Sequence, residues 1–304
     1  MSKPTRLAVA FGASFLGFPT HLGFLRALIA GGWKPHAVAG SSAGALLAGL
    51  YAAGLKMEVI EAEFTRADLK LQFRERSFPL RALGTFLGRG GVPAVLLGHK
   101  IERVLTGLVG DMRIEDCPAA RLHLAVVNLR TSAVELRDRG PLVETILASC
   151  ALPGFLAPRR MDGELLWDGG LGSVVPVEQW IDDPDITHLA AHTILHEEQV
   201  ASRARPERLN FPGAMFAGHQ LTADEVLRWK LELARRSGKV TVPIETVTQR
   251  PRLGLPITAP ARQPWPVLAR GLIALGERSA QTALARLGPG PLAVTAAEMP
   301  AASY

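Results

Sequence analysis

Residues 36–50 read His36-Ala37-Val38-Ala39-Gly40-Ser41-Ser42-Ala43-Gly44-Ala45-Leu46-Leu47-Ala48-Gly49-Leu50 and join a short apolar strand pattern to an Ala- and Leu-rich helix pattern. At the centre, Gly40 to Gly44 has the form G-x-S-x-G, which is typical of a sharp strand-to-helix turn that exposes a serine hydroxyl. We expect Gly40 and Gly44 to support this turn, because a side chain two residues from the serine would collide with the neighbouring strand or helix. The helix N-terminus would then lie under Ser42, where its free N–H groups favour negative charge. The pattern makes Ser42 our candidate nucleophile.

The sequence around this turn alternates between strand and helix patterns. A strand pattern at 6–11 and a helix pattern at 21–30 precede the strand at 35–39, which is the opening of a doubly wound sheet. Strands that are apolar on both faces belong in a parallel sheet covered by helices on both sides. We therefore predict a three-layer α/β/α fold with a mostly parallel central sheet. Further strands are expected at 122–128, 133–137 (its hairpin partner) and 187–195, and further helices at 43–55, 57–70, 98–108, 141–149, 222–236 and 267–287.

The C-terminal third differs in composition from the rest of the chain. Residues 199–265 are rich in Arg and Pro and show no sustained strand pattern. We expect one domain over residues 1–304, with its core at about 6–200 and a helical C-terminal portion at 201–304. Residues 71–95 mix arginines with phenylalanines and leucines, which indicates either an amphipathic insertion or a cap over the site.

Composition excludes several classes of protein. Of the 304 residues, 48% are hydrophobic and 20% are charged, which supports a sizeable core and argues against disorder. The net charge of +6 suggests an anionic partner, but the basic residues are scattered and no nucleic-acid-binding motif is present, so we expect no nucleic acid partner. Cys117 and Cys150 are the only cysteines, which is too few for a disulfide framework and makes a cytoplasmic setting the simplest expectation. The uncharged run Val38–Leu55 reaches the length of a membrane span, but the glycines and serines at its start favour a turn that feeds a buried helix.

A serine nucleophile needs a base, and two kinds of base are open. Asp168-Gly169-Gly170 predicts a tight turn, supported by Gly169 and Gly170, that would present the carboxylate directly to the serine. An aspartate has a low reference pKa, so it serves as a base at neutral pH only where partial desolvation raises that pKa. The other option is a histidine that follows the acid in the chain, as in α/β-hydrolases: His188, His192, His196 or His219. His192, His196 and Glu197 also invite a metal interpretation, but they lie on a strand pattern without H-E-x-x-H, so we expect no metal site.

The loop from Gly12 to Gly17 is the candidate source of oxyanion donors. It follows a strand and consists largely of small residues, so successive backbone N–H groups can point into one concavity. We expect the N–H groups of Gly12, Ala13 and Ser14 to hold the oxyanion. The loop lacks the Lys-Ser/Thr ending of a phosphate-binding loop, and the G-x-G-x-x-G of dinucleotide-binding proteins is absent, so neither sequence pattern predicts a nucleotide cofactor.

The three motifs together resemble the patatin-like phospholipase family. That family has a glycine-rich oxyanion loop, then G-x-S-x-G, then D-G-G or D-G-A; here Gly12–Gly17, Gly40–Gly44 and Asp168–Gly170 stand in the same order. Further likeness lies in Ala148-Ser149-Cys150-Ala151-Leu152-Pro153-Gly154. The resemblance covers about residues 6–200, and it implies a fold of the patatin type.

The resemblance also implies an activity. It is hydrolysis of lipid acyl esters, of the phospholipase A or lysophospholipase kind, through an acyl-enzyme and without a metal or organic cofactor. The implied dyad contains no histidine, with Ser42 as nucleophile and Asp168 as its base. Ala13 and Ser14 stand where the family has glycines, and Leu16 stands where it has Arg or Lys. Backbone N–H groups donate from any of these residues, but the lost cation leaves rate and substrate open.

Two alternatives therefore stay beside the Ser–Asp interpretation. One is an esterase of the α/β-hydrolase type with a histidine triad. The other is a catalytically silent lipid- or partner-binding protein on the same fold, because of Leu16. The expected partner is a lipid ester, and the expected location is the cytoplasm or, as a peripheral protein, a membrane surface.

Overall fold

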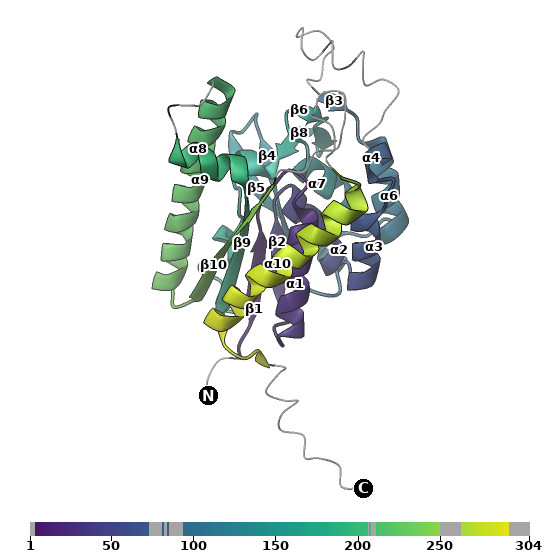
Figure 1. Ribbon diagram of the computed structural model, residues 1–304. Coiled ribbons are helices and arrows are strands. Elements are labelled where there is room, and N and C mark those ends of the chain that lie inside the picture. Colours follow the sequence, from purple (N-terminus) through teal and green to yellow (C-terminus); the bar gives the residue numbers. More distant parts are fainter. Residues whose placement is uncertain are drawn as a thin grey trace.

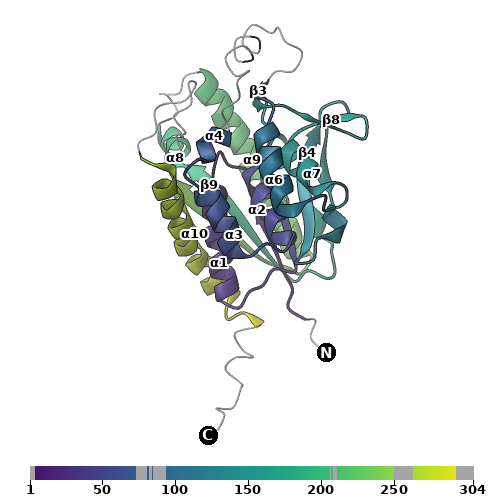
Figure 2. The same ribbon diagram turned by 90° about the vertical axis from the view of Figure 1, so that its right-hand side faces the viewer.

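The computed structural model describes residues 4–72, 81, 84, 94–205, 207, 211–249 and 263–291. Most of the segment expected as an insertion or cap, 71–95, lies outside the described residues. Figures 1 and 2 show the arrangement of helices and strands in two views that differ by a quarter turn.

A mixed, mostly parallel sheet forms the centre of the fold (Figure 1). The strands are β1 (Leu7–Phe11), β2 (Ala37–Gly40), β3 (Ala94–Leu96), β4 (Arg121–Asn128), β5 (Ala133–Arg137), β6 (Gly154–Leu156), β7 (Arg159–Met161), β8 (Glu164–Asp168), β9 (His188–His196) and β10 (Val240–Thr248). The central sheet has the order β10–β9–β1–β2–β4–β8–β7, with β5 also paired to β4, while β3 and β6 form a separate small sheet. From β10 to β4 neighbouring strands are parallel, whereas β5, β8 and β7 join in antiparallel pairs. This confirms the predicted α/β class.

Helices cover both faces of the sheet (Figure 2). They are α1 (Phe18–Ala30), α2 (Ala43–Ala52), α3 (Met57–Thr65), α4 (Leu69–Gln72), α6 (His99–Val109), α7 (Leu142–Ser149), α8 (Glu197–Ala204), α9 (Phe211–Arg236) and α10 (Trp265–Leu287). Alternate side chains of β1 point to opposite faces. Val9 and Phe11 join a large core with α1, α2, α3, α7 and α10. Ala10 belongs to a smaller core with Trp180 and with Leu231 of α9. The sheet is therefore the middle of three layers.

Helix α10 packs tightly along α1 on the larger-core side. A Cβ built on Gly23 of α1 would overlap the backbone carbonyl of Ile273, and one built on Gly276 of α10 would overlap that of Thr20. Two glycines thus permit backbone-to-backbone packing of these helices. The indole N–H of Trp265, at the start of α10, donates to the Phe64 carbonyl of α3 at 2.8 Å and fixes the helix end.

Strand β10 corrects the expectation that residues 199–265 contain no strand. It runs parallel to β9 over nine paired residues and completes one edge of the described sheet. Pro243 lies in the middle of this strand. An edge strand tolerates proline because the missing N–H falls on the unpaired side. The Pro243 carbonyl accepts a hydrogen bond from Arg286 of α10 at 3.0 Å.

Two helices also differ from expectation. The helix predicted at 222–236 begins at Phe211, so Thr222 lies inside it and its hydroxyl donates to the Gly218 carbonyl. The helix predicted at 57–70 divides into α3 and α4. The other predicted elements are present, with ends shifted by at most three residues.

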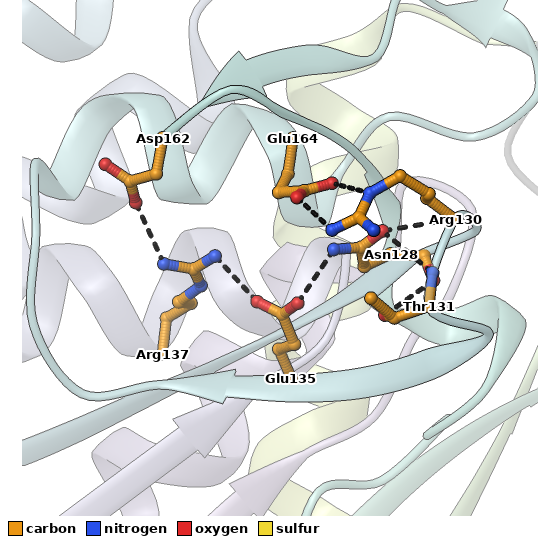
Figure 3. A network of polar contacts seen from close by, with 7 residues as sticks. All are labelled: Asn128, Arg130, Thr131, Glu135, Arg137, Asp162 and Glu164. Atoms are coloured by element: carbon orange, nitrogen blue, oxygen red, sulfur yellow. Dashed lines mark hydrogen bonds and ion pairs between the residues drawn. The ribbon is translucent and has the colours of Figure 1, made fainter.

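A polar network joins the β4–β5 hairpin to the β7–β8 hairpin (Figure 3). Arg137 of β5 pairs with Glu135 of the same strand at 2.6 Å and with Asp162 of the β7–β8 turn at 3.2 Å. Arg130, in the turn between β4 and β5, donates to Glu164 at the start of β8 at 2.7 Å. Partly exposed surface pairs of this kind contribute less than about 1 kcal/mol each. These pairs hold the β7–β8 hairpin against the β4–β5 hairpin, and this matters for the site because β8 ends at Asp168.

Candidate active site

Ser42 lies in the turn between β2 and α2. Its backbone has φ of 55° and ψ of −119°, a conformation that residues other than glycine rarely adopt. A Cβ on Gly40 would overlap the backbone of Gly44, and a Cβ on Gly44 would overlap the carbonyl of Phe11. Strand, turn and helix therefore approach one another closely enough to require glycine at both positions. The turn lifts the partly exposed Ser42 side chain above the end of β2.

The end of α7 holds the strained backbone of Ser42 from both sides. The Ser42 N–H donates to Ser149 Oγ at 3.0 Å, and the Cys150 thiol donates to the Ser42 carbonyl at 3.2 Å. Burial raises the pKa of Cys150, so the thiol keeps its proton and remains a donor. Holding a residue in such a conformation costs about 1–3 kcal/mol, which surrounding contacts must offset. Both residues lie in the stretch that resembles the family, but the sequence alone does not predict these contacts.

The sheet brings Asp168 to Ser42 by an unusual junction. Strands β5 and β8 both pair with Val126–Asn128 of β4, so they occupy opposite edges of that strand. Strands β2 and β5 both pair with Leu124, so β2 also lies on the edge of β4 opposite β5. Strands β2 and β8 consequently lie on one side of β4 and run toward each other. Strand β2 ends at Gly40, opposite Leu124 of β4, and β8 ends at Asp168, opposite Val126 of β4. The serine turn and the aspartate turn meet where the two strand ends face each other.

Ser42 Oγ donates to Asp168 Oδ2 at 2.8 Å. The other carboxylate oxygen, Oδ1, accepts the N–H of Gly170 at 2.7 Å, as the short turn allows. Gly169, the first residue after Asp168, packs closely against β4, because a Cβ at this position would overlap the carbonyl of Ala125. Asp168 is 3% exposed, and burial raises its pKa to about 7, opposed in part by the hydrogen bonds from Gly170 and Ser42. A carboxyl group with this pKa exchanges protons near neutrality.

The candidate histidines occupy other places. Within the described residues, no hydrogen bond joins a histidine to Ser42 or Asp168. His188 contacts the Thr187 hydroxyl at 2.9 Å, and His196 caps the start of α8. His219 donates to the Gly170 carbonyl at 3.2 Å, behind the aspartate turn. His192 is buried beneath the Gly12 loop, with contacts described below.

The Gly12 loop lies beside the aspartate turn, and its three candidate donors differ. A Cβ on Gly170 would lie 2.7 Å from the Ala13 Cβ, which places the loop against the turn. The Gly12 N–H donates to the His192 carbonyl at 3.0 Å, and the Ala13 N–H donates to the Val174 carbonyl at 2.8 Å. The Ser14 N–H makes no hydrogen bond to another described residue. Backbone hydrogen bonds therefore occupy the N–H groups of Gly12 and Ala13, whereas the N–H of Ser14 is available to a ligand.

No group of three His, Cys, Asp or Glu side chains that could hold a metal ion is found in the described part of the chain. His192 and His196 both lie on β9, with their side chains in the separate contacts given above. The uncharged run at 38–55 forms the end of β2 and the buried helix α2. Among the described helices, none combines the length and the apolar character needed to cross a bilayer.

The fold and site define a class: an α/β protein whose turn serine is hydrogen-bonded directly to a buried aspartate. The family model for patatin-like phospholipases matches residues 11–181. This is more than half of the chain, and the chain belongs to this family of lipid hydrolases. The resemblance inferred from the three motifs is thereby confirmed.

Similar proteins support this membership. A protein of the NTE family from Mycobacterium bovis, itself uncharacterised, is 33% identical over 176 residues, covering 58% of this chain and 46% of that protein. The lysophospholipase NTE1 of Yarrowia lipolytica is 31% identical over 160 residues, which are 53% of this chain and 11% of that protein. The matched part thus spans less than half the length of these relatives. The solved structure of VipD from Legionella pneumophila aligns with a TM-score of 0.52 at 14% identity, covering 93% of this chain and 67% of that one, and shares the fold.

Proposed function

We propose that this protein is a serine hydrolase of lipid acyl esters, in which Ser42 is the nucleophile and Asp168 is the base. The observation that carries the proposal is the 2.8 Å hydrogen bond from Ser42 Oγ to Asp168 Oδ2, made to a carboxyl group whose pKa burial raises to about 7. Such a group is partly ionised at neutral pH and basic enough to take the serine proton, whereas an ordinary aspartate is a weak base.

The proposed cycle has two halves. Ser42 Oγ attacks the ester carbonyl carbon while its proton passes to Asp168, and the carbonyl oxygen becomes an oxyanion. The intermediate then expels the alcohol, which takes the proton from Asp168 and leaves an acyl-enzyme on Ser42. Water attacks the acyl carbon and gives its proton to Asp168. Collapse of this second intermediate releases the fatty acid, and the proton returns to Ser42 Oγ.

Stabilisation of the oxyanion falls to N–H groups that the fold leaves open. Gly12 and Ala13 were expected donors, but each would have to exchange an existing backbone hydrogen bond. The proposal gives the main role to the N–H of Ser14. It adds the N–H of Ala43, the first residue of α2, because the residue after the nucleophile supplies a donor in comparable serine turns. The dipole of α2 acts in the same direction.

For the substrate we propose phospholipids and lysophospholipids. The family is one of phospholipases, and the relative from Yarrowia lipolytica is named a lysophospholipase. A histidine triad is the less favoured alternative, because the Ser42 hydroxyl donates to the aspartate itself. A catalytically silent protein remains the alternative that Leu16 suggests; this residue has φ of 58° and a buried side chain.

Two variants test the proposal. Ser42→Ala and Asp168→Asn should each reduce hydrolysis of a short-chain nitrophenyl ester at least about 10³-fold, as losses of a nucleophile and of its base do. The matched controls are Ser237→Ala and Asp162→Asn, both at exposed positions, and they should keep the activity. Alanine variants of His188 and His196 should keep it as well. Retained activity in Ser42→Ala, or its loss in one of these folded histidine variants, would contradict the proposal.

A further inference from the structure

A buried chain of hydrogen bonds runs from β10 to the Gly12 loop. His21 of α1 and His192 of β9 are both fully buried, and their Nδ1 atoms lie 2.9 Å apart. The remaining ring nitrogens make one contact each. His21 Nε2 is 2.9 Å from the Gly12 carbonyl oxygen, and His192 Nε2 is 2.8 Å from Thr246 Oγ1. The Gly12 loop and α1, which are neighbours in sequence, thus meet the distant strands β9 and β10 in one polar chain.

Only one arrangement of protons satisfies every member of this chain while both rings stay neutral. The Gly12 carbonyl can only accept, so His21 carries its proton on Nε2. His21 Nδ1 is then an acceptor, which requires His192 to donate from Nδ1. His192 Nε2 in turn accepts the Thr246 hydroxyl proton. The chain therefore has a direction, from Thr246 through the two rings to the Gly12 carbonyl.

The surroundings keep both rings neutral and fixed. His192 stacks on Phe24 with ring centroids 4.1 Å apart, and His21 meets Phe11 edge to face at 5.4 Å. Burial lowers the pKa of His21 to about 4 and that of His192 well below its usual value. A proton added to His21 would turn both Nδ1 atoms into donors and break the contact between them, and a proton added to His192 would remove the acceptor of the Thr246 hydroxyl.

Gly12 is held from both sides by this chain. Its N–H donates to the His192 backbone carbonyl, and its own carbonyl accepts from His21, whose ring bonds that of His192. The next residue, Ala13, is fixed by its bond to Val174. The first free donor of the loop, the Ser14 N–H, follows directly on these two clamped residues.

We propose that His21 and His192 are positioning residues for the oxyanion loop: their paired rings lock the Gly12 peptide and thereby fix the Ser14 N–H, the first open donor of the loop. The proposal rests on the proposed function of Ser42 and Asp168. It assigns these two histidines a role apart from proton transfer to substrate. Strand β10 contributes the far end of the chain, where the Thr246 hydroxyl donates to His192 Nε2.

The test compares two substitutions at one position. His192→Phe removes the donor to His21 and keeps an aromatic ring against Phe24, whereas His192→Asn keeps an N–H near the place of Nδ1. We expect His192→Phe to lower kcat on the nitrophenyl ester about 10- to 100-fold with KM within about twofold, since a displaced donor costs about this much. His192→Asn should recover at least about tenfold of that loss. The matched control is His123→Phe, a largely buried histidine of β4 whose Nδ1 has no partner among the described residues, and it should keep kcat.

Two readouts do not depend on hydrolysis. Nitrogen NMR of the imidazoles should show His21 protonated at Nε2 and His192 at Nδ1, and hydrogen exchange at the bonded N–H groups of Gly12 and Ala13 should accelerate in His192→Phe. Thr246→Val, a milder change, should disturb the His192 ring signals if His192→Phe does not fold. The reverse tautomers, unchanged exchange at Gly12 and Ala13, or equal kcat for wild type and His192→Phe would overturn the positioning role. An inactive wild type with the expected tautomers and exchange would instead refute the proposed hydrolase function and leave the loop clamp standing.

Discussion

The substitution Asp168→Asn should make the protein more stable at alkaline pH while it abolishes activity. Burial raises the pKa of Asp168 from 3.8 to about 7, so the folded protein holds a proton that the unfolded chain has already released in this range. A folded-state pKa above the unfolded one gives stability that is complete below about pH 4 and is lost as the pH rises through 7. The loss is about 1.4 kcal/mol per pH unit between the two values, or about 4 kcal/mol in all. Asparagine carries no charge at any pH, so Asp168→Asn does not lose stability in this way.

The assay is urea unfolding of wild type and variant at pH 5 and pH 8. Integrating the two titrations, the stability of Asp168→Asn relative to wild type should be greater at pH 8 than at pH 5 by about 2.5 kcal/mol. The control Asp162→Asn removes an exposed carboxylate of the same hairpin and should stay within about 0.5 kcal/mol of wild type at both values. A relative stability of Asp168→Asn that does not change with pH would show that Asp168 is not held protonated by burial, and the reasoning about its basicity would fail.

Three further predictions use other contacts of the structure. The value of kcat/KM should rise from pH 5 and level off above a midpoint near 7, because the ionised Asp168 is the base; a profile flat across this range would count against that role. Ser149→Ala leaves the Ser42 N–H without its acceptor and should lower stability by about 1–3 kcal/mol and kcat about tenfold, as measured by urea unfolding and ester hydrolysis; full activity would show that the strained turn needs no clamp. Gly276→Ala should destabilise by about 1–3 kcal/mol because its Cβ would overlap the Thr20 carbonyl, whereas Gly271→Ala on the same helix meets no atom and should stabilise by up to about 1 kcal/mol; equal thermal midpoints for both would refute the close packing of α1 and α10.

Much of the fold could be predicted from local sequence signals. The strands at 7–11 and 37–40 are apolar on both faces, and the helices between and after them are bounded by glycines, so their order and type followed directly from the pattern. Strand β10 could not be predicted in this way. Its Pro243 and Glu245 are tolerated only because it lies at a sheet edge, and that position depends on pairing with β9, which the local sequence does not encode.

In the candidate site, too, some features could be predicted from the local sequence and others could not. Gly40 and Gly44 marked the serine turn because steric requirements within five residues are visible in the sequence. The direct contact of Ser42 with Asp168 was expected only through the family resemblance, since it depends on β2 and β8 meeting on one side of β4. The histidine pair was beyond prediction for the same reason, because α1, β9 and β10 assemble it only in the folded chain.

The role of Ser42 is tested most directly by labelling with a fluorophosphonate, followed by mass spectrometry to locate the adduct. The reagent reacts with an activated serine and needs neither the natural head group nor the natural acyl chain. We predict one adduct, on Ser42, in the folded wild-type protein, with no adduct in Ser42→Ala and much slower labelling in Asp168→Asn. A folded wild-type protein that stays unlabelled, or one labelled on another serine, would contradict the assignment of Ser42 as the nucleophile.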